Sequence, residues 1–202
     1  MRIAGALALC VILASCALGG PAPVTTPVAG TTSTPIKGAS KPRITPPAVT
    51  PPTAPGTNLP VFKCADITGG TAGAAKVTAV RAAEQAGAGY DRFVLQFDSR
   101  VPQYTVKRQA KPTFTTGGSG QTLTLSGTAG VLVQVHSASE SGSYTGPSDL
   151  SHAEFQILKE ARLTEDFEGY VSWGIGLNKP VCMRAFTLSD PARLVIDFST
   201  TS

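Results

Sequence analysis

Apolar and polar residues alternate in short stretches along the C-terminal two thirds of the chain. The alternation is strongest in residues 90–97, whose two phenylalanines and one leucine fall on one face, and it recurs in residues 131–135. Such alternation indicates strands with one buried face, and many short strands predict an all-β, antiparallel β-sandwich. The other stretches with strand character are 76–81, 104–108, 122–125, 155–163, 167–177, 182–188 and 194–198.

Glycine, serine and proline clusters separate these stretches and predict turns. We expect residues 164–166 to join the two longest strands. Residues 149–162 leave two alternatives, a helix capped at Ser148 or Asp149, or a short turn at 149–152 followed by a strand; we favour the second. The clusters lie at 87–89, 117–120, 141–142 and 189–191.

The N-terminus has the order of a secretory signal: Arg2, an apolar run, then Leu13-Ala14-Ser15-Cys16. A cysteine after such a triplet matches the bacterial lipobox, so we expect a signal peptide at 1–15 and lipidation of Cys16 with acyl chains such as palmitate. This would hold the protein on the extracytoplasmic face of the cell membrane. The alternative is a cleaved signal without lipid. The apolar run is shorter than the roughly 18 residues of a spanning helix.

Residues 16–60 read as a disordered linker, and residues 61–202 as the folded domain. Ten of the 16 prolines lie between Pro21 and Pro55, among Thr, Ala and Gly. Such a segment buries too little apolar surface to fold, and its prolines favour an extended spacer.

The predicted domain is electrically neutral, with 13 basic and 13 acidic residues from Val61 onward. The net charge of +4 therefore comes from Arg2, Lys37, Lys41 and Arg43. Without a basic footprint on the domain, we expect no nucleic-acid partner.

Two of the four cysteines remain for the exported domain, because Cys10 lies in the signal and Cys16 takes lipid. We expect Cys64 and Cys182 to pair, since exported proteins favour disulfides. The alternative is two buried free thiols.

No catalytic constellation is visible. The chain has only His136 and His152 as imidazole bases, no Gly-x-Ser-x-Gly motif and no zinc-ligand spacing. The acidic residues at 165, 166 and 168 read as a solvated hairpin tip. We therefore expect no enzyme activity, no metal and no cofactor.

Four side chains are candidates for binding. Tyr170 and Trp173 point to opposite faces of one strand, so one of the two rings can offer a stacking surface for a sugar or peptide; Trp173 in the core is the alternative. Arg92 and Arg193 suit a ligand carboxylate, or else a structural pair with Asp91 or Asp197.

An assembled series of motifs resembles actinobacterial lipoproteins with an AMIN-like domain, over about residues 74–199. The motifs are residues 89–97, Pro102-x-Tyr104-x-Val106, Phe167-Glu168-Gly169 with residues 173–177, and Phe186-x-Leu188-x-x-Pro191-x-Arg193 running into residues 194–198. The resemblance implies a β-sandwich that binds peptidoglycan or another envelope partner. We therefore expect a membrane-anchored lipoprotein that binds envelope glycan, with docking to an envelope protein as the alternative.

Overall fold

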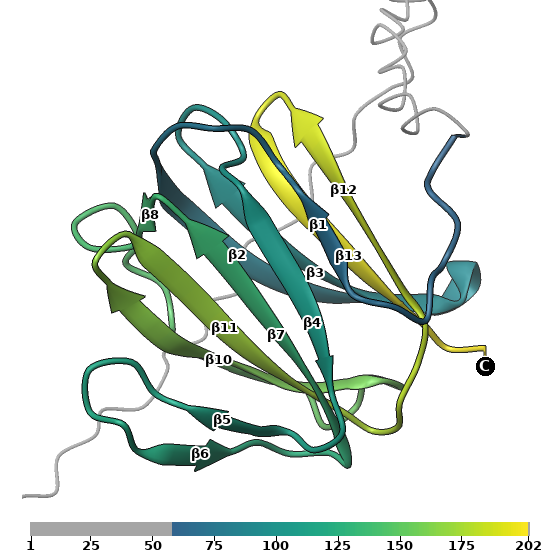
Figure 1. The fold of residues 1–202 in the computed structure, drawn as a ribbon. Coiled ribbons are helices and arrows are strands. Elements are labelled where there is room, and N and C mark those ends of the chain that lie inside the picture. The colour runs from purple at the N-terminus through teal and green to yellow at the C-terminus, as the bar shows by residue number, and fades with distance from the viewer. Residues whose placement is uncertain (1–57, 202) are drawn as a thin grey trace, which may run out of the picture. The chain divides into compact units, whose positions relative to one another are not determined.

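The computed structural model describes residues 58–201. The predicted signal peptide, the lipidation site Cys16 and nearly all of the linker lie outside these residues. Within them the regular secondary structure is almost all strand, with one 3-10 turn, η1 (Ala86–Ala88) (Figure 1). No helix in this part of the chain is long and apolar enough to cross a membrane.

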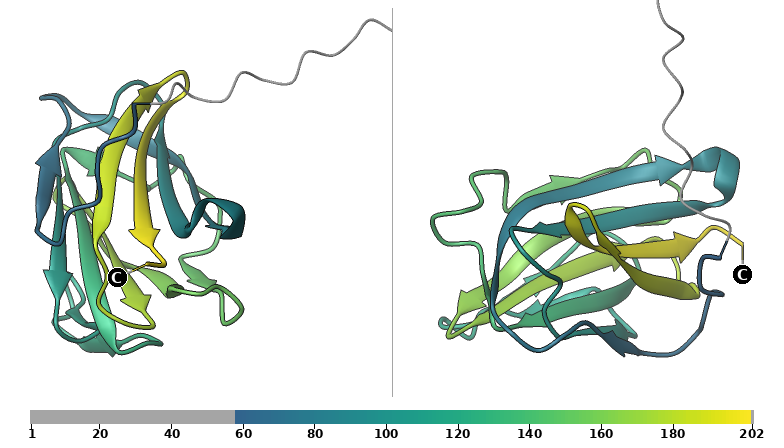
Figure 2. Two further views of the ribbon diagram at one scale, coloured as in Figure 1. Left: turned by 90° about the vertical axis from the view of Figure 1, so that its right-hand side faces the viewer. Right: turned by 90° about the horizontal axis from the view of Figure 1, so that it is seen from above.

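Two sheets form the sandwich that the alternation predicts, and Figure 2 shows them face to face. The first has six strands, all paired antiparallel. In order across the sheet these are β1 (Ile67–Gly69), β4 (Tyr104–Gln109), β7 (Ala129–His136), β11 (Tyr170–Leu177), β10 (Leu158–Phe167) and β9 (Asp149–Ser151).

The second sheet has five strands. Its first four are antiparallel, and the two-residue strand β8 adds in parallel at the edge. The order is β12 (Met183–Ser189), β13 (Ala192–Ser199), β3 (Tyr90–Phe97), β2 (Ala75–Gln85) and β8 (Ala138–Ser139).

The core lies between the two sheets and contains the predicted inward faces. Phe93, Leu95 and Phe97 of β3 are almost fully buried, as are the three valines of β7. Asp91 also points inward from β3, and its Oδ2 accepts the backbone N–H groups of Ile157 and Leu158 at 2.6 and 2.9 Å. This carboxylate fixes the loop that leads into β10.

A small hairpin covers part of the outer surface of the six-stranded sheet. It consists of β5 (Thr113–Thr115) and β6 (Thr122–Thr124), and the predicted glycine turn connects them. Phe114 of the hairpin is buried against Gly174 of β11 and Gly130 of β7. A Cβ at Gly174 would lie 2.7 Å from the Phe114 ring, so the missing side chain makes room for the hairpin.

Two local expectations are corrected by the structure. The turn between the long strands lies at Glu168 and Gly169, not at 164–166, because both residues adopt positive φ (49° and 79°) and close a two-residue hairpin. Residues 149–162 hold the short strand β9 and the start of β10, in place of either a helix or a turn at 149–152.

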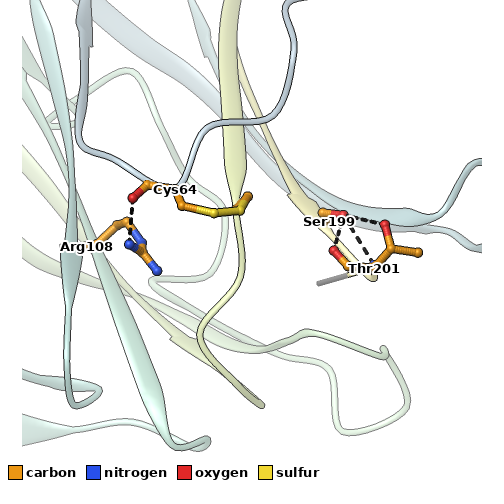
Figure 3. The surroundings of a disulfide bond; sticks show 5 residues. Cys64, Arg108, Ser199 and Thr201 are labelled. Atoms are coloured by element: carbon orange, nitrogen blue, oxygen red, sulfur yellow. Dashed lines mark hydrogen bonds between the residues drawn. A yellow bond between two sulfur atoms is a disulfide. The ribbon is translucent and has the colours of Figure 1, made fainter.

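Cys64 and Cys182 form a disulfide, as the sequence predicts (Figure 3). Next to it, Lys63 and Met183 exchange two backbone hydrogen bonds of 2.8 and 2.9 Å. The segment that enters the domain is therefore joined to β12, near the end of the chain.

Candidate functional site

The outer faces of the two sheets carry the side chains that can meet a ligand. Within residues 58–201, no group of three His, Cys, Asp or Glu side chains is placed to hold a metal ion. Each outer face holds one organised set of residues, and the two sets differ in chemistry.

An aromatic row lies at one end of the six-stranded sheet, which we define as Phe167, Tyr170 and His136. Strand register places these residues side by side on β10, β11 and β7. The exposed fractions of Phe167 and Tyr170 are 56% and 40%, and the rings of Tyr170 and His136 lie 5.1 Å apart. With Val61, these two are the large apolar side chains that stand out from the surface described by the structure.

A polar row lies beside the aromatic row on the same face, two residues further along each strand from the turn of the β10–β11 hairpin. Register aligns Glu165, Ser172, Gln134 and Thr105 across four strands. Ser172 Oγ donates to Glu165 Oε2 at 3.1 Å, and Gln134 Nε2 donates to Ser172 Oγ at 3.4 Å. Thr105 Oγ1 is buried without a hydrogen-bond partner among the described residues.

A shallow hollow borders both rows on the side of β1 and β4. It brings carbonyl, amide, hydroxyl and imidazole groups together beside the aromatic row. Its lining residues are Thr68, Gly69, Gly70, Gln103, Tyr104, Thr105 and His136.

The structure places Trp173 in the core, which corrects the expectation of a stacking surface at this residue. Its side chain is fully buried and packs at 5.7 Å from the ring of Phe93. Its Nε1 donates to Glu140 Oε1 at 2.7 Å. Burial raises the pKa of the Glu140 carboxyl to about 7; the Trp173 hydrogen bond opposes the rise, and the charge of Asp166 adds to it.

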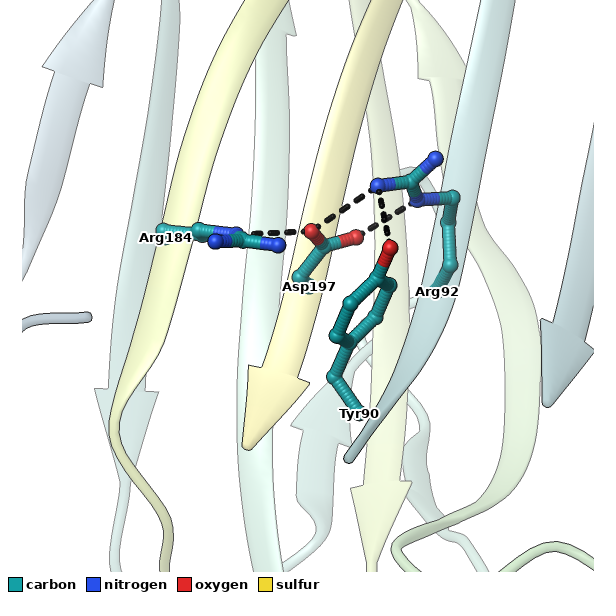
Figure 4. Close-up of polar contacts among 4 residues, drawn as sticks. All are labelled: Tyr90, Arg92, Arg184 and Asp197. Atoms are coloured by element: carbon teal, nitrogen blue, oxygen red, sulfur yellow. Dashed lines mark hydrogen bonds and ion pairs between the residues drawn. The ribbon is translucent and has the colours of Figure 1, made fainter. Parts of the chain in front are cut away.

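The second set is an arginine row on the five-stranded sheet, which we define as Arg184, Asp197 and Arg92 (Figure 4). Register aligns the three residues across β12, β13 and β3. Arg92 donates to Asp197 through Nε at 2.6 Å and Nη2 at 3.0 Å, and Arg184 donates through Nε at 2.8 Å. Burial lowers the pKa of Arg92, but the hydrogen bond and charge of Asp197 outweigh it and raise the pKa.

The AMIN-like domain model matches residues 75–200 of this chain. The chain belongs to the AMIN-like domain family. AMIN-like domains are non-catalytic modules associated with the cell envelope, and membership indicates an envelope location for this protein. A search of the curated proteins finds no match.

The AMIN-like domain separates the four predicted binding residues. Tyr170 lies at the surface of the six-stranded sheet, Trp173 in the core, and Arg92 on the five-stranded sheet, where it pairs with Asp197. Arg193 lies on that same outer face and donates to the backbone oxygens of Pro191 and Asp190 at 3.2 and 3.3 Å.

Sequence reasoning missed three members of the aromatic and arginine rows. Phe167 joins Tyr170 through the register of the β10–β11 hairpin, which the misplaced turn hid, and His136 joins Tyr170 through the pairing of β7 with β11, between strands far apart in the sequence. Arg184 belongs with Arg92 because both flank Asp197 in the aligned strands. The alternation in residues 182–188 does not point to Arg184, because it places this residue on the same face as the apolar Phe186 and Leu188.

Proposed function

We propose that this AMIN-like domain binds glycan of the cell envelope through the aromatic row, and that lipidated Cys16 holds it at the membrane. The protein acts without catalysis. The family's association with the envelope and the lipobox both support this proposal.

The exposed rings of Phe167 and Tyr170 carry the proposal. Large aromatic side chains are normally buried, and rings exposed together mark surfaces that bind another molecule. Aromatic faces pack against the C–H faces of sugars, while amides, hydroxyls and carboxylates bind sugar hydroxyls. Glu165 and Gln134, which are partly exposed on the same sheet face, supply a carboxylate and an amide.

The turn of the hairpin β5–β6 lies against the polar row: Gly117 N–H donates to Thr164 O at 2.9 Å, and an added Cβ at Gly117 would lie 2.6 Å from the Glu165 side chain. Phe114 covers the part of the sheet around Gly130 and Gly174, away from the aromatic row. A chain of sugars therefore has access to the exposed rings of the aromatic row, which none of these hairpin contacts involves.

Co-sedimentation with purified peptidoglycan sacculi tests the binding. We expect the protein without residues 1–16 to be retained at physiological salt, and Tyr170→Ala and Phe167→Ala each to weaken retention about tenfold. Val61→Ala removes an exposed apolar side chain outside the row and serves as the control, with unchanged retention. Lack of retention of the unmodified protein, or equal losses in the control, would reject glycan binding.

In-cell crosslinking distinguishes glycan binding from the alternative, which is docking to an envelope protein. A single stoichiometric envelope protein captured through the aromatic row, with no sacculus binding, would favour a protein-docking role over glycan binding.

The anchor needs its own test. Cys16→Ser is expected to move the protein from the membrane fraction to the soluble extracytoplasmic fraction and to abolish incorporation of labelled palmitate. Labelled protein in the Cys16→Ser variant would contradict lipidation at this residue.

A further inference from the structure

We propose that the outer face of the five-stranded sheet is a second binding surface, which takes an envelope polymer bearing repeated carboxylate or phosphate groups. The surface is centred on the arginine row. It is separate from the aromatic row, since the two lie on the outer faces of different sheets.

Positive charge is in excess on this face. Alternation along the strands places Arg81 of β2 and Arg193 of β13 on the same side as the arginine row, because they pair with Val94 and Gln96 of β3. Asp197 is the single carboxylate among these aligned outward positions. Its charge offsets one of four arginines, so the face carries a surplus of three positive charges although the domain as a whole is neutral.

Arg184 keeps unused donors at the surface. It contacts Asp197 through Nε, and its two Nη groups make no hydrogen bond to the described residues. Neither Nη atom is among the fully buried atoms that lack a partner, so each keeps some contact with solvent, although the side chain as a whole is only 12% exposed. Donors of a planar guanidinium are thus left without a protein partner, in a geometry that matches a carboxylate or a phosphate.

Aromatic rings hold the guanidinium groups in place. The Cζ atom of Arg184 lies 4.5 Å from the ring centre of Phe62 and 4.9 Å from that of Tyr90. The Cζ atom of Arg92 lies 5.0 Å from Tyr90 and 5.5 Å from Phe186. Because the side chains are already ordered, an anion that binds them loses little additional entropy.

Recessed guanidinium groups favour a polymer over a lipid surface. The side chains of Arg92 and Arg184 are only 22% and 12% exposed, between rings that stand beside them. A thin, extended chain can place single anionic groups against such donors, whereas a planar array of headgroups meets the rings first. Arg81 and Arg193 extend the positive surface along the sheet for further groups of the same chain.

Titration with two polyanions tests the surface and distinguishes carboxylate from phosphate. The protein without residues 1–16 is titrated with poly-L-glutamate and with inorganic polyphosphate, at 50 and 300 mM salt. We expect binding at low salt that weakens at high salt, as for exposed ionic contacts. The polyanion bound more tightly identifies the preferred group.

Arginine variants locate the binding. The double variant Arg81→Gln with Arg193→Gln and the single variant Arg184→Gln are each expected to weaken polyanion binding about tenfold, while Arg92 keeps its pair with Asp197. Lys107→Gln, on the outer face of the other sheet, is the matched control. Unchanged fluorescence of the buried Trp173 confirms that each variant is folded.

Three results would overturn the proposal. The first is equal affinity of the arginine variants and the unmodified protein. The second is an equal loss in Lys107→Gln, which would mean unspecific attraction. The third is binding to phosphatidylglycerol vesicles through the same arginines with neither polyanion bound. Sacculus retention through the aromatic row is measured separately, so each surface can fail without the other.

Discussion

At the scale of single residues, the buried carboxylates have distinct roles. Asp197 is fully buried but sits between two guanidinium groups, and Asp91 accepts two backbone N–H groups. Glu140 differs, because its buried neighbour is the neutral indole of Trp173 and the nearby charge of Asp166 is negative. Its charged form is therefore disfavoured in the folded state.

The titration of Glu140 gives the first prediction. Its pKa is about 7 when folded, against an ordinary value of 4.5, so the folded state keeps a proton that the unfolded chain has lost between these pH values. The contribution of Glu140 to the free energy of unfolding is thus largest below about pH 4.5 and declines as the pH rises to about 7, by at most ~1.4 kcal/mol per pH unit.

Urea denaturation at several pH values measures this slope. Glu140→Gln keeps an oxygen for Trp173 and cannot ionise, so its stability should decline less between pH 4.5 and 7. Glu168→Gln, at the exposed hairpin tip, should leave the slope unchanged. The same slope in Glu140→Gln and the unmodified protein would rule out Glu140 as its source.

At the scale of elements, the hairpin β5–β6 depends on glycines in β7 and β11, where other residues would carry side chains. Gly130 and Gly174 leave the space in which Phe114 packs, and Gly176 of β11 lies directly beneath Ser126 O, at 2.1 Å from an added Cβ. The glycines of these central strands are therefore a requirement of the third layer.

A side chain at Gly174 is expected to displace the hairpin. Gly174→Val places atoms where the Phe114 ring lies, and loss of that ring's burial should reduce the free energy of unfolding by about 3 kcal/mol. Gly87→Ala is the control, because nothing lies within 4 Å of its Cβ, and its change should stay below about 1 kcal/mol. Urea unfolding compares the two; a loss in Gly174→Val no larger than the control would contradict the packing role.

The disulfide is the second feature that stabilises the domain at this scale. Its partners are 118 residues apart, and a loop of that length predicts a loss of roughly 4–5 kcal/mol when the bond is removed. Cys64→Ser with Cys182→Ser should therefore unfold at lower urea concentration than the oxidised protein. Reducing agent should destabilise the unmodified protein by the same amount and leave the double variant unchanged.

The sequence predicts the sandwich and most of its long strands, because one buried face leaves a period of two in residues such as Phe93, Leu95 and Phe97. Prediction from the sequence fails where apolar residues do not alternate with polar ones. Central β11 is buried on both faces, so alternation does not reveal which of Tyr170 and Trp173 faces the core. The turn at Glu168 and Gly169 lacks an asparagine or aspartate, and the aromatic row depends on its register. Short strands such as β1 and β9 carry too few residues for any pattern.

At the scale of the whole domain, a neutral total conceals two outer faces of different character. One presents rings beside hydroxyl, amide and carboxylate groups, and the other presents arginines framed by rings. A module of this kind can contact two polymers, or two parts of one polymer, at the same time.

Independence of the faces is the prediction at this scale. Tyr170→Ala should lower sacculus retention and leave polyanion affinity unchanged. Arg184→Gln should lower polyanion affinity and leave unchanged the retention by sacculi from which anionic polymers have been stripped. The double variant should show the sum of both losses in free energy, since the residues share no contact. Sedimentation and calorimetry on the same preparations measure it; a Tyr170→Ala variant that loses polyanion affinity would show that the faces are coupled.

The disulfide also determines how the domain bears mechanical load. With the anchor at Cys16 proposed above, a pull on the tether arrives at residues 58–64. Without the covalent link it would peel away β1, which holds to β4 by three register pairs. The bond to Cys182 passes the force instead to the start of β12, which holds to β13 by seven register pairs. In the proposed arrangement, with the domain bound to the wall and Cys16 held in the membrane, this link keeps the force off the short edge strand β1.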